Sequence, residues 1–162
     1  MGRKLVIKRS YDSPIDIVWN AWADPEQAKQ WWGPRGYTAP VVELDQRPGG
    51  KWRSLMISPN GTEYWQHGVY REIVPKKHIV YTFIWDREPE HEMLVTVDFS
   101  ARAGKTEIAF QQTGFLSDDE RDGHKDGWGE SFDRLADYLA AANKNKTTAK
   151  AKKGEGEANA RR

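Results

Sequence analysis

The chain of 162 residues contains no cysteine and no apolar segment long enough to cross a membrane. Without cysteine, disulfide bonds and every chemistry that needs a thiolate are excluded. The first ten residues, MGRKLVIKRS, also lack the apolar core of a secretory signal peptide. We therefore predict a cytoplasmic protein that does not act at a membrane.

A large net charge is also absent, because 25 Lys and Arg residues balance 24 Asp and Glu residues to a formal charge of +1. This balance argues against a dedicated nucleic-acid or membrane-surface protein. Positive charge gathers only in residues 143–162, which hold five Lys and two Arg against two Glu. That segment has no aromatic or large aliphatic side chain, so we predict a disordered basic tail there and one folded domain over residues 1–142. A binding arm for nucleic acid or an acidic partner is the alternative for the tail.

The common motifs of catalysis and cofactor binding are missing too. No Gly-x-Ser-x-Gly elbow, phosphate-binding loop or dinucleotide fingerprint occurs. The four histidines, His67, His78, His91 and His124, lack the spacing of zinc ligands. We therefore predict no metal and no cofactor. His67 is the candidate general base, although no carboxylate neighbours it in the sequence.

Tryptophan is what the chain has in abundance, with eight residues, several of them in two short helices near the N-terminus. After a strand over residues 4–11, Ser13 and Pro14 suit the start of a helix. Trp19 and Trp22 then fall on its apolar stripe. Asp24 and Pro25 end this helix and open a second one, which runs to residue 32. We expect these tryptophans to pack against the end of a sheet.

A run of six further strands follows, over residues 38–46, 51–58, 62–74, 78–86, 92–101 and 105–114. Apolar and polar residues alternate in most of them, and short turns separate several neighbours. The strands should therefore pair as antiparallel hairpins, apart from the helices. This pattern predicts the α+β class, with a curved antiparallel sheet of about seven strands.

The strand over residues 62–74 has two possible registers. A four-residue loop over residues 75–78 would pair Val74 with the residue after that loop and turn Gln66, Gly68 and Tyr70 inward. A slip by one residue would instead turn Trp65, His67 and Arg71 inward. We favour the first register.

The last predicted element is a helix of about 25 residues that ends near Ala142. Residues 117–120, Ser-Asp-Asp-Glu, form a capping box at its start, and a cation site is the alternative role for these acids. Trp128, Phe132 and Leu135 lie on its apolar stripe, which must face the sheet. Gly123, Gly127 and Gly129 interrupt its first half, although a glycine costs about 0.5–1 kcal/mol in a helix.

Four segments in this order resemble the activator-of-heat-shock-protein-90-ATPase homologue family of the START-like (SRPBCC) superfamily. They are SPIDIVWNAWADPEQAKQWWGP, ELDQRPGGKWRSLM, HGVYREIVPKKHIVYTF and DGWGESFDRLADYL, and the resemblance covers about residues 5–142. It implies a helix-grip fold, in which a curved antiparallel sheet grips a long C-terminal helix and two short helices close one end. It also implies an apolar cavity between the sheet and the long helix. Some superfamily members bind lipids, sterols, flavonoids or hormones there, and some are cyclases or dehydratases.

The first functional hypothesis is therefore a protein that binds an apolar or aromatic small molecule in this cavity. The alternative is a chaperone-cofactor module of the stress response, and the third is a cyclase- or dehydratase-like enzyme. Family members that act as co-chaperones carry a separate N-terminal domain with an Asn- and Trp-rich motif. Since no such motif precedes Leu5, we expect no activation of the chaperone's ATPase. The chain would act as a monomer or a dimer.

The candidate cavity-lining residues are those expected on the inner face of the sheet and on the helix stripe: Trp52, Ser54, Met56, Tyr70, Tyr81, Phe83, Trp85, Val97, Phe99, Ile108, Phe110, Trp128, Phe132 and Leu135. Gly127 and Gly129 are expected to leave space over the aromatic residues of strand 78–86, with Trp128 as a wall and Phe132 and Leu135 as the floor. The alternative is that these glycines permit close backbone contact.

Overall fold

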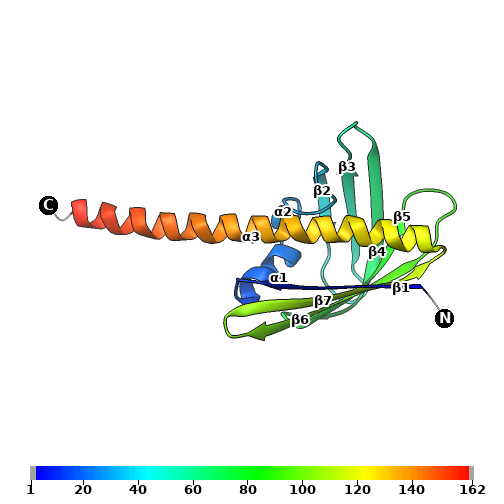
Figure 1. Ribbon diagram of the computed structural model, residues 1–162, viewed down its shortest axis with the longest axis horizontal. Helices are drawn as coiled ribbons and strands as arrows, with labels where there is room; N and C mark the ends of the chain where they lie inside the picture. The colour runs from blue at the N-terminus through cyan, green and yellow to red at the C-terminus, as the bar shows by residue number, and fades with distance from the viewer. Residues whose placement is uncertain (1–2, 161–162) are drawn as a thin grey trace.

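A curved sheet wraps around one long helix in the computed structural model, which describes residues 3–160 and the side chains of residues 3–142 (Figure 1). Its seven antiparallel strands have the spatial order β1-β7-β6-β5-β4-β3-β2. They are β1 (Arg3–Tyr11), β2 (Thr38–Leu44), β3 (Lys51–Ile57), β4 (Glu63–Val74), β5 (His78–Trp85), β6 (Met93–Arg102) and β7 (Lys105–Phe115). The predicted α+β helix-grip fold is confirmed.

Two short helices, α1 (Ile15–Ala23) and α2 (Pro25–Ala28), follow β1. The start of α1 is one residue later than expected: Pro14, and not Ser13, occupies the cap position. The backbone carbonyl of Ser13 instead accepts a hydrogen bond from Thr106 Oγ1, which ties the entry of the helix to β7. Asp24 caps α2 as predicted, because its carboxylate accepts the N–H of Glu26 at 3.0 Å.

The long helix α3 (Asp118–Ala160) lies across the sheet. Ser117 caps it by accepting the N–H of Glu120 at 3.0 Å, and the Glu120 carboxylate reaches back to the N–H of Leu116. The acidic residues there are thus part of a helix start, as predicted. The helix was expected to end near Ala142, whereas α3 continues to Ala160. The disordered basic tail predicted for residues 143–162 stays a prediction, and the side chains from residue 143 onward lie outside the described residues. Among residues 3–160 no helix combines the length and apolar character that crossing a bilayer requires.

A bulge in β4 decides which side chains of this strand face inward. Val74 pairs with His78 and not with Ile79, so the loop is one residue shorter than predicted. If this pairing continued along the whole strand, Arg71 would face inward. The register shifts between Tyr70 and Glu72, and this bulge returns the residues before it to the inward and outward alternation that was predicted. Gln66, Gly68 and Tyr70 are therefore buried, as predicted, by a route that the sequence analysis did not foresee.

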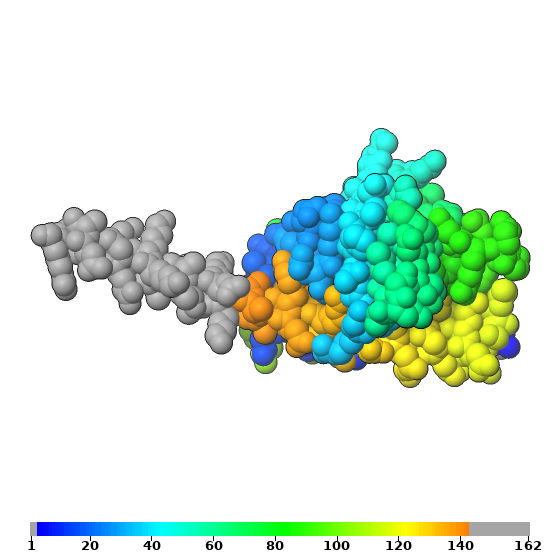
Figure 2. All heavy atoms as spheres, turned by 90° about the horizontal axis from the view of Figure 1, so that it is seen from above, coloured from blue at the N-terminus to red at the C-terminus, as the bar shows by residue number. Residues whose placement is uncertain are grey.

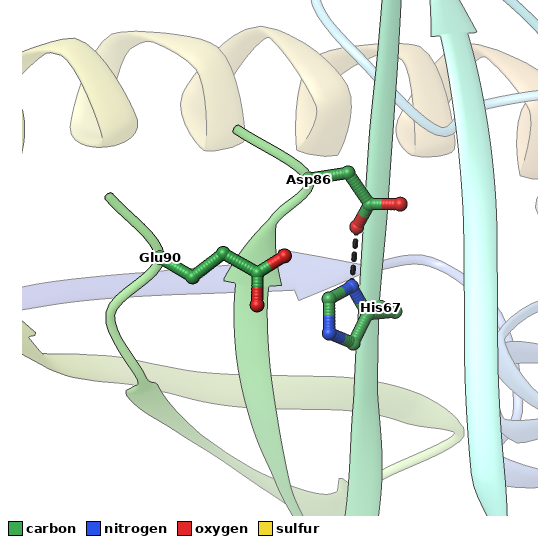
Figure 3. Close-up of side chains that lie close together, drawn as sticks. All are labelled: His67, Asp86 and Glu90. Carbon is green, nitrogen blue, oxygen red and sulfur yellow. Dashed lines mark hydrogen bonds and ion pairs between the residues drawn. The ribbon is translucent and has the colours of Figure 1, made fainter. Parts of the chain in front are cut away.

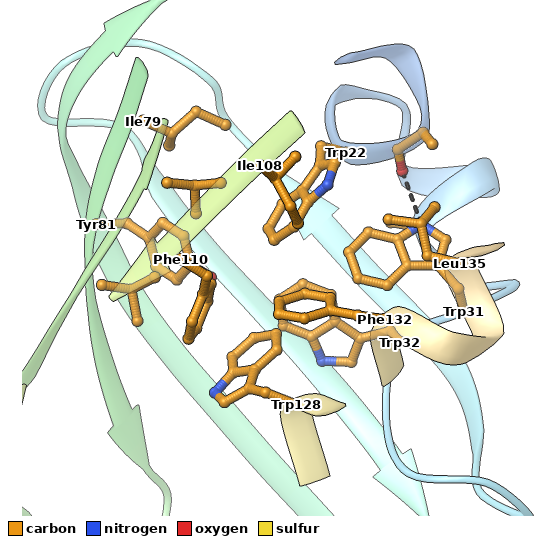
Figure 4. Packing of buried hydrophobic residues seen from close by; sticks show 14 of the residues in the cluster. Trp22, Trp31, Trp32, Ile79, Tyr81, Ile108, Phe110, Trp128, Phe132 and Leu135 are labelled. Carbon is orange, nitrogen blue, oxygen red and sulfur yellow. Dashed lines mark hydrogen bonds between the residues drawn. The ribbon is translucent and has the colours of Figure 1, made fainter. Parts of the chain in front are cut away.

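The core lies where α1, α2, the sheet and α3 meet (Figure 4). Trp19, Trp22, Trp31 and Trp32 are at most 7% exposed, which confirms that they pack against the sheet end. Phe132 of α3 stands among them, with its ring 5.9 Å from Trp22 and 5.1 Å from Phe110. Aromatic side chains thus fill the half of the molecule near α1.

Figure 2 shows the described part of α3, yellow to orange, running along one side of the body.

Candidate functional site

A pocket of about 360 Å³ lies at the other half of the molecule, between the first turns of α3, the strands β3–β5 and the loop after α2. Most of its wall is apolar or aromatic. The lining residues are Trp32, Gly33, Pro34, Tyr37, Met56, Tyr64, Gln66, Phe83, Trp85, Arg87, Asp119, Glu120, Gly123, His124, Gly127, Trp128 and Ser131. The size and the character of this wall are those of a small-molecule site.

Four of the candidate residues line this pocket: Met56, Phe83, Trp85 and Trp128. The other ten are at most 6% exposed and belong to the packed interior instead. They are Trp52, Ser54, Tyr70, Tyr81, Val97, Phe99, Ile108, Phe110, Phe132 and Leu135. Part of this interior is filled by Trp22 and Trp31, whose rings pack against Phe99 and Phe132.

The glycines of α3 separate into two groups. Gly123 and Gly127 line the pocket, and a Cβ at Gly127 would meet Pro34 Cγ at an ordinary contact distance of 3.7 Å. The expected role of Gly129 is wrong, since it borders an open groove beside β1, where a Cβ would lie 3.6 Å from Arg9. Two residues along a helix rotate a side chain by about 200°, so Gly127 and Gly129 must face opposite ways. Close backbone contact, the alternative explanation, does not occur at any of the three.

The sequence analysis missed the wall that the loop after α2 provides. Arg134 of α3 donates hydrogen bonds to the carbonyl oxygens of Gln30, Trp32, Gly33 and Pro34, at 2.9 to 3.3 Å. Gly33 has φ +101°, and a Cβ there would meet Met56 Sδ at 2.9 Å, so this position suits only glycine. The Gly-Pro pair signalled the end of a helix, but nothing in the sequence indicated that the loop folds back onto α3.

Ser131 strengthens the same attachment. Its hydroxyl donates to the carbonyl of Trp31 at 2.8 Å and accepts the N–H of Gly33 at 3.3 Å. Ser131 is 1% exposed and comes from α3, about a hundred residues away along the chain. The loop is therefore held in place from one face of α3, which positions Trp32 over the pocket.

A hydrogen-bonded chain of four side chains forms one end of the pocket. Trp85 Nε1 donates to His124 Nε2 at 3.0 Å, and His124 Nδ1 lies 3.2 Å from Gln112 Oε1, which also accepts from Trp128 Nε1. Because an indole only donates, His124 Nε2 carries a lone pair and Nδ1 carries the proton. Burial lowers the pKa of His124 to about 4, so the imidazole is neutral. Both of its nitrogens are occupied within this chain.

A second group of side chains lies outside the pocket, where β4 passes the end of β5 (Figure 3). Within the described side chains, His67, Asp86 and Glu90 offer three ligand atoms within 4.8 Å of one another, a set that could hold a metal ion. The carboxylate of Asp86 contacts His67 Nδ1, so the fold supplies the carboxylate that the sequence did not place beside this histidine. His67 does not line the pocket, so as a base it would not act there.

Comparisons with known proteins agree with this architecture. The sequence model of a family described as "Activator of Hsp90 ATPase homolog 1-like protein" (AHSA1) matches residues 12–140. No curated protein matches the chain. The crystal structure of the AHSA1 protein from Silicibacter pomeroyi superposes with a TM-score of 0.78 at 24% identity, over 86% of this chain and 99% of that one.

Two further solved structures show the same fold. A protein from Chromobacterium violaceum has a TM-score of 0.75 and 25% identity, over 83% of this chain and 95% of its own. A protein from Rhizobium leguminosarum has a TM-score of 0.73 and 28% identity, over 87% of this chain and 96% of its own. The whole folded body, and not a fragment of it, is thus shared with these proteins.

Proposed function

Because the chain belongs to the Activator of Hsp90 ATPase homolog 1-like family, whose START-like fold is that of ligand-binding or Hsp90-cofactor proteins, we propose that it binds an apolar or aromatic small molecule in the pocket beside α3. The observation that carries this proposal is the pocket itself, with a volume of about 360 Å³ and aromatic rings on several sides. We place this binding protein in the cytoplasm.

The wall of the pocket supports an aromatic ligand in particular. The rings of Tyr64 and Trp85 lie 6.3 Å apart, and those of Phe83 and Trp85 lie 5.2 Å apart, both nearly perpendicular. Aromatic side chains favour such edge-to-face arrangements with a further ring. Gly123 and Gly127 place no side chain on the face of α3 that borders the pocket, which leaves space for a ligand. Their low helix propensity makes α3 less stable there.

Binding of the uncharged fluorescent probe N-phenyl-1-naphthylamine tests this proposal. We expect the wild type to bind the probe with one saturable site. Gly127→Leu should weaken binding at least about tenfold, because the new side chain enters the pocket from a position where its Cβ fits. Gly129→Leu is the matched control on the opposite face of the helix and should bind as the wild type does. Absence of binding by the wild type, or equal binding by all three proteins, would contradict the proposal.

The family's name makes an Hsp90-cofactor role the alternative function. It requires a surface that docks on the chaperone rather than an open pocket. A titration against Hsp90 of the same organism separates the two, and we expect no saturable stimulation of its ATPase. Saturable stimulation that Gly127→Leu leaves unchanged would place the cofactor role first.

A further inference from the structure

One polar side chain reaches the pocket from its most buried wall. Gln66 of β4 is only 1% exposed, yet it is among the residues that line the pocket. Its neighbours there are Tyr64 on the same strand, Trp32 from the loop and Phe83 on β5. A polar group in such apolar surroundings is costly unless each of its donors and acceptors has a partner.

The orientation of this amide is set by its neighbours. Trp32 Nε1 lies 3.0 Å from Gln66 Oε1, and Ser54 Oγ lies 2.7 Å from the same atom. An indole N–H can only donate, so the Gln66 atom that faces Trp32 must be the carbonyl oxygen. The amide nitrogen Nε2, with two N–H groups, therefore occupies the other position.

This nitrogen makes no hydrogen bond to any side chain or backbone group in residues 3–142. The other buried glutamine differs in this respect. Gln112 accepts from Trp128 and from His124 through its oxygen and donates from its nitrogen to Met93 Sδ at 3.5 Å. Because Gln66 lines the pocket, its two N–H groups can donate to an acceptor atom placed there.

We propose that the pocket selects a planar, uncharged aromatic molecule with a carbonyl oxygen, such as an aryl ketone or a quinone, and that this oxygen accepts a hydrogen bond from Gln66 Nε2. The inference rests on the proposed function and adds the class of ligand. The rings of the wall account for the planar aromatic part, and the N–H groups of Gln66 account for the acceptor.

Charge decides between a carbonyl and a carboxylate. The charged residues of the wall, Arg87, Asp119 and Glu120, are contributed by the end of β5 and the first turn of α3, and none of them bonds to Gln66. The nearest ionisable ring of the wall, His124, is neutral because burial lowers its pKa to about 4. The wall thus carries one cation, Arg87, against two carboxylates, Asp119 and Glu120, so a further carboxylate is less favourable there than an uncharged carbonyl with one donor.

Two probes of equal shape test this inference: 2-acetylnaphthalene and 2-isopropenylnaphthalene, which differ by an oxygen in place of a CH₂ group. The variant is Gln66→Met, which keeps the length of the side chain and removes both N–H groups, so it cannot donate to the ketone in any protonation state. The quantity to measure is the Kd of the alkene divided by the Kd of the ketone. We expect this ratio to fall at least about tenfold from wild type to variant, because only the ketone loses a hydrogen bond.

A second measurement uses the wild type alone, and decides the matter if Gln66→Met does not fold. In ¹⁵N-resolved NMR spectra, the side-chain amide protons of Gln66 should shift downfield on titration with the ketone and stay in place with the alkene. If both probes bind and Gly127→Leu weakens both, while the ratio and the Gln66 signals are unchanged, the pocket is a binding site and the assigned ligand class is wrong. If the wild type binds neither probe, the proposed function fails and this inference fails with it.

Discussion

At the scale of the residue, the indole N–H groups organise the interior of this protein. Those of Trp31 and Trp52 donate to backbone carbonyls, of Ala21 and Thr82. Those of Trp32, Trp85 and Trp128 donate to polar side chains around the pocket, as described above. Since an indole can only donate, every such partner must present an acceptor, and this requirement sets the tautomer of His124 and the amide orientations of both glutamines.

The neutral state of His124 predicts a pH dependence of stability. Its pKa is about 4 in the folded protein and about 6.5 in the unfolded chain, so between these values the unfolded chain binds more protons. The stability that His124 contributes is therefore complete above about pH 6.5 and is lost as the pH falls towards 4. Between pH 7.5 and 5.0 this amounts to about 2 kcal/mol of unfolding free energy, which urea titrations at the two pH values would measure.

His124→Gln is the control for this effect, because glutamine can accept from Trp85 and does not titrate. The variant should lose about 2 kcal/mol less than the wild type between pH 7.5 and 5.0. His78 titrates in the opposite direction: hydrogen bonds to Asp98 and Glu72 raise its pKa, so its contribution is present at low pH and is lost as the pH rises through that pKa. It is common to both proteins and cancels in the comparison. Equal losses in the two proteins would contradict a neutral, buried His124.

At the scale of the element, α3 combines a packed half with a half that borders empty space. Trp128, Phe132, Leu135 and Leu139 form its buried stripe, as the spacing predicts, and are at most 7% exposed. Three glycines lie in the first turns of α3, at the start of this stripe. Gly123 and Gly127 lower the helix propensity on the face at the pocket, and Gly129 lowers it on the face beside β1.

Replacement of these glycines by alanine should stabilise the protein. A Cβ at Gly123 meets no atom within 4 Å, and at Gly127 and Gly129 it makes only ordinary contacts. Each single substitution should therefore raise the free energy of unfolding by about 0.5–1 kcal/mol, through helix propensity alone. Thermal unfolding of the three variants would show this as a Tm increase of about 1–4 °C. A decrease at Gly127 would mean that its backbone is packed more tightly than the structure shows.

At the scale of the whole molecule, a single aromatic cluster joins three parts of the chain that are far apart in sequence. Phe132 of α3 contacts Trp22 of α1, Trp31 after α2 and Phe110 of β7. It is completely buried (Figure 4). The cluster closes one half of the space between sheet and helix, and this closure confines the pocket to the other half.

Truncation of this central ring should be severe. We expect Phe132→Ala to lower the free energy of unfolding by about 3–5 kcal/mol, because the cavity would be surrounded by rigid rings that cannot collapse into it. Urea titration measures the loss, and Phe132→Leu, which keeps most of the volume, should cost less than half as much. Similar costs for both variants would show that aromatic contacts, rather than volume, make up the contribution of Phe132.

Periodicity predicted the type and order of the elements, because each depends on neighbours within a few residues. It did not predict every end: α2 ends at Ala28 and not at residue 32, and α3 continues past Ala142 to Ala160. The stripes of α1 and α3, the alternation of the strands, and the caps Asp24 and Ser117 were all legible in the sequence. The inward face of β4 was predicted as well, although a bulge that no local pattern revealed was needed to produce it. Helical geometry alone could have shown that Gly127 and Gly129 face opposite ways.

The location of the pocket was decided only by the tertiary structure. Ten of the fourteen candidate residues lie on the correct faces of their strands and helix, yet they are buried in the packed core, part of which Trp22 and Trp31 fill. Which half of the interior is filled depends on how the side chains of α1, α2 and the loop after α2 fit between sheet and α3. That fit depends on contacts between segments about a hundred residues apart in the chain, such as the hydrogen bonds from Arg134 to the loop carbonyls. A sequence pattern records the face on which a residue lies, whereas packing determines whether that face meets another side chain or an open space.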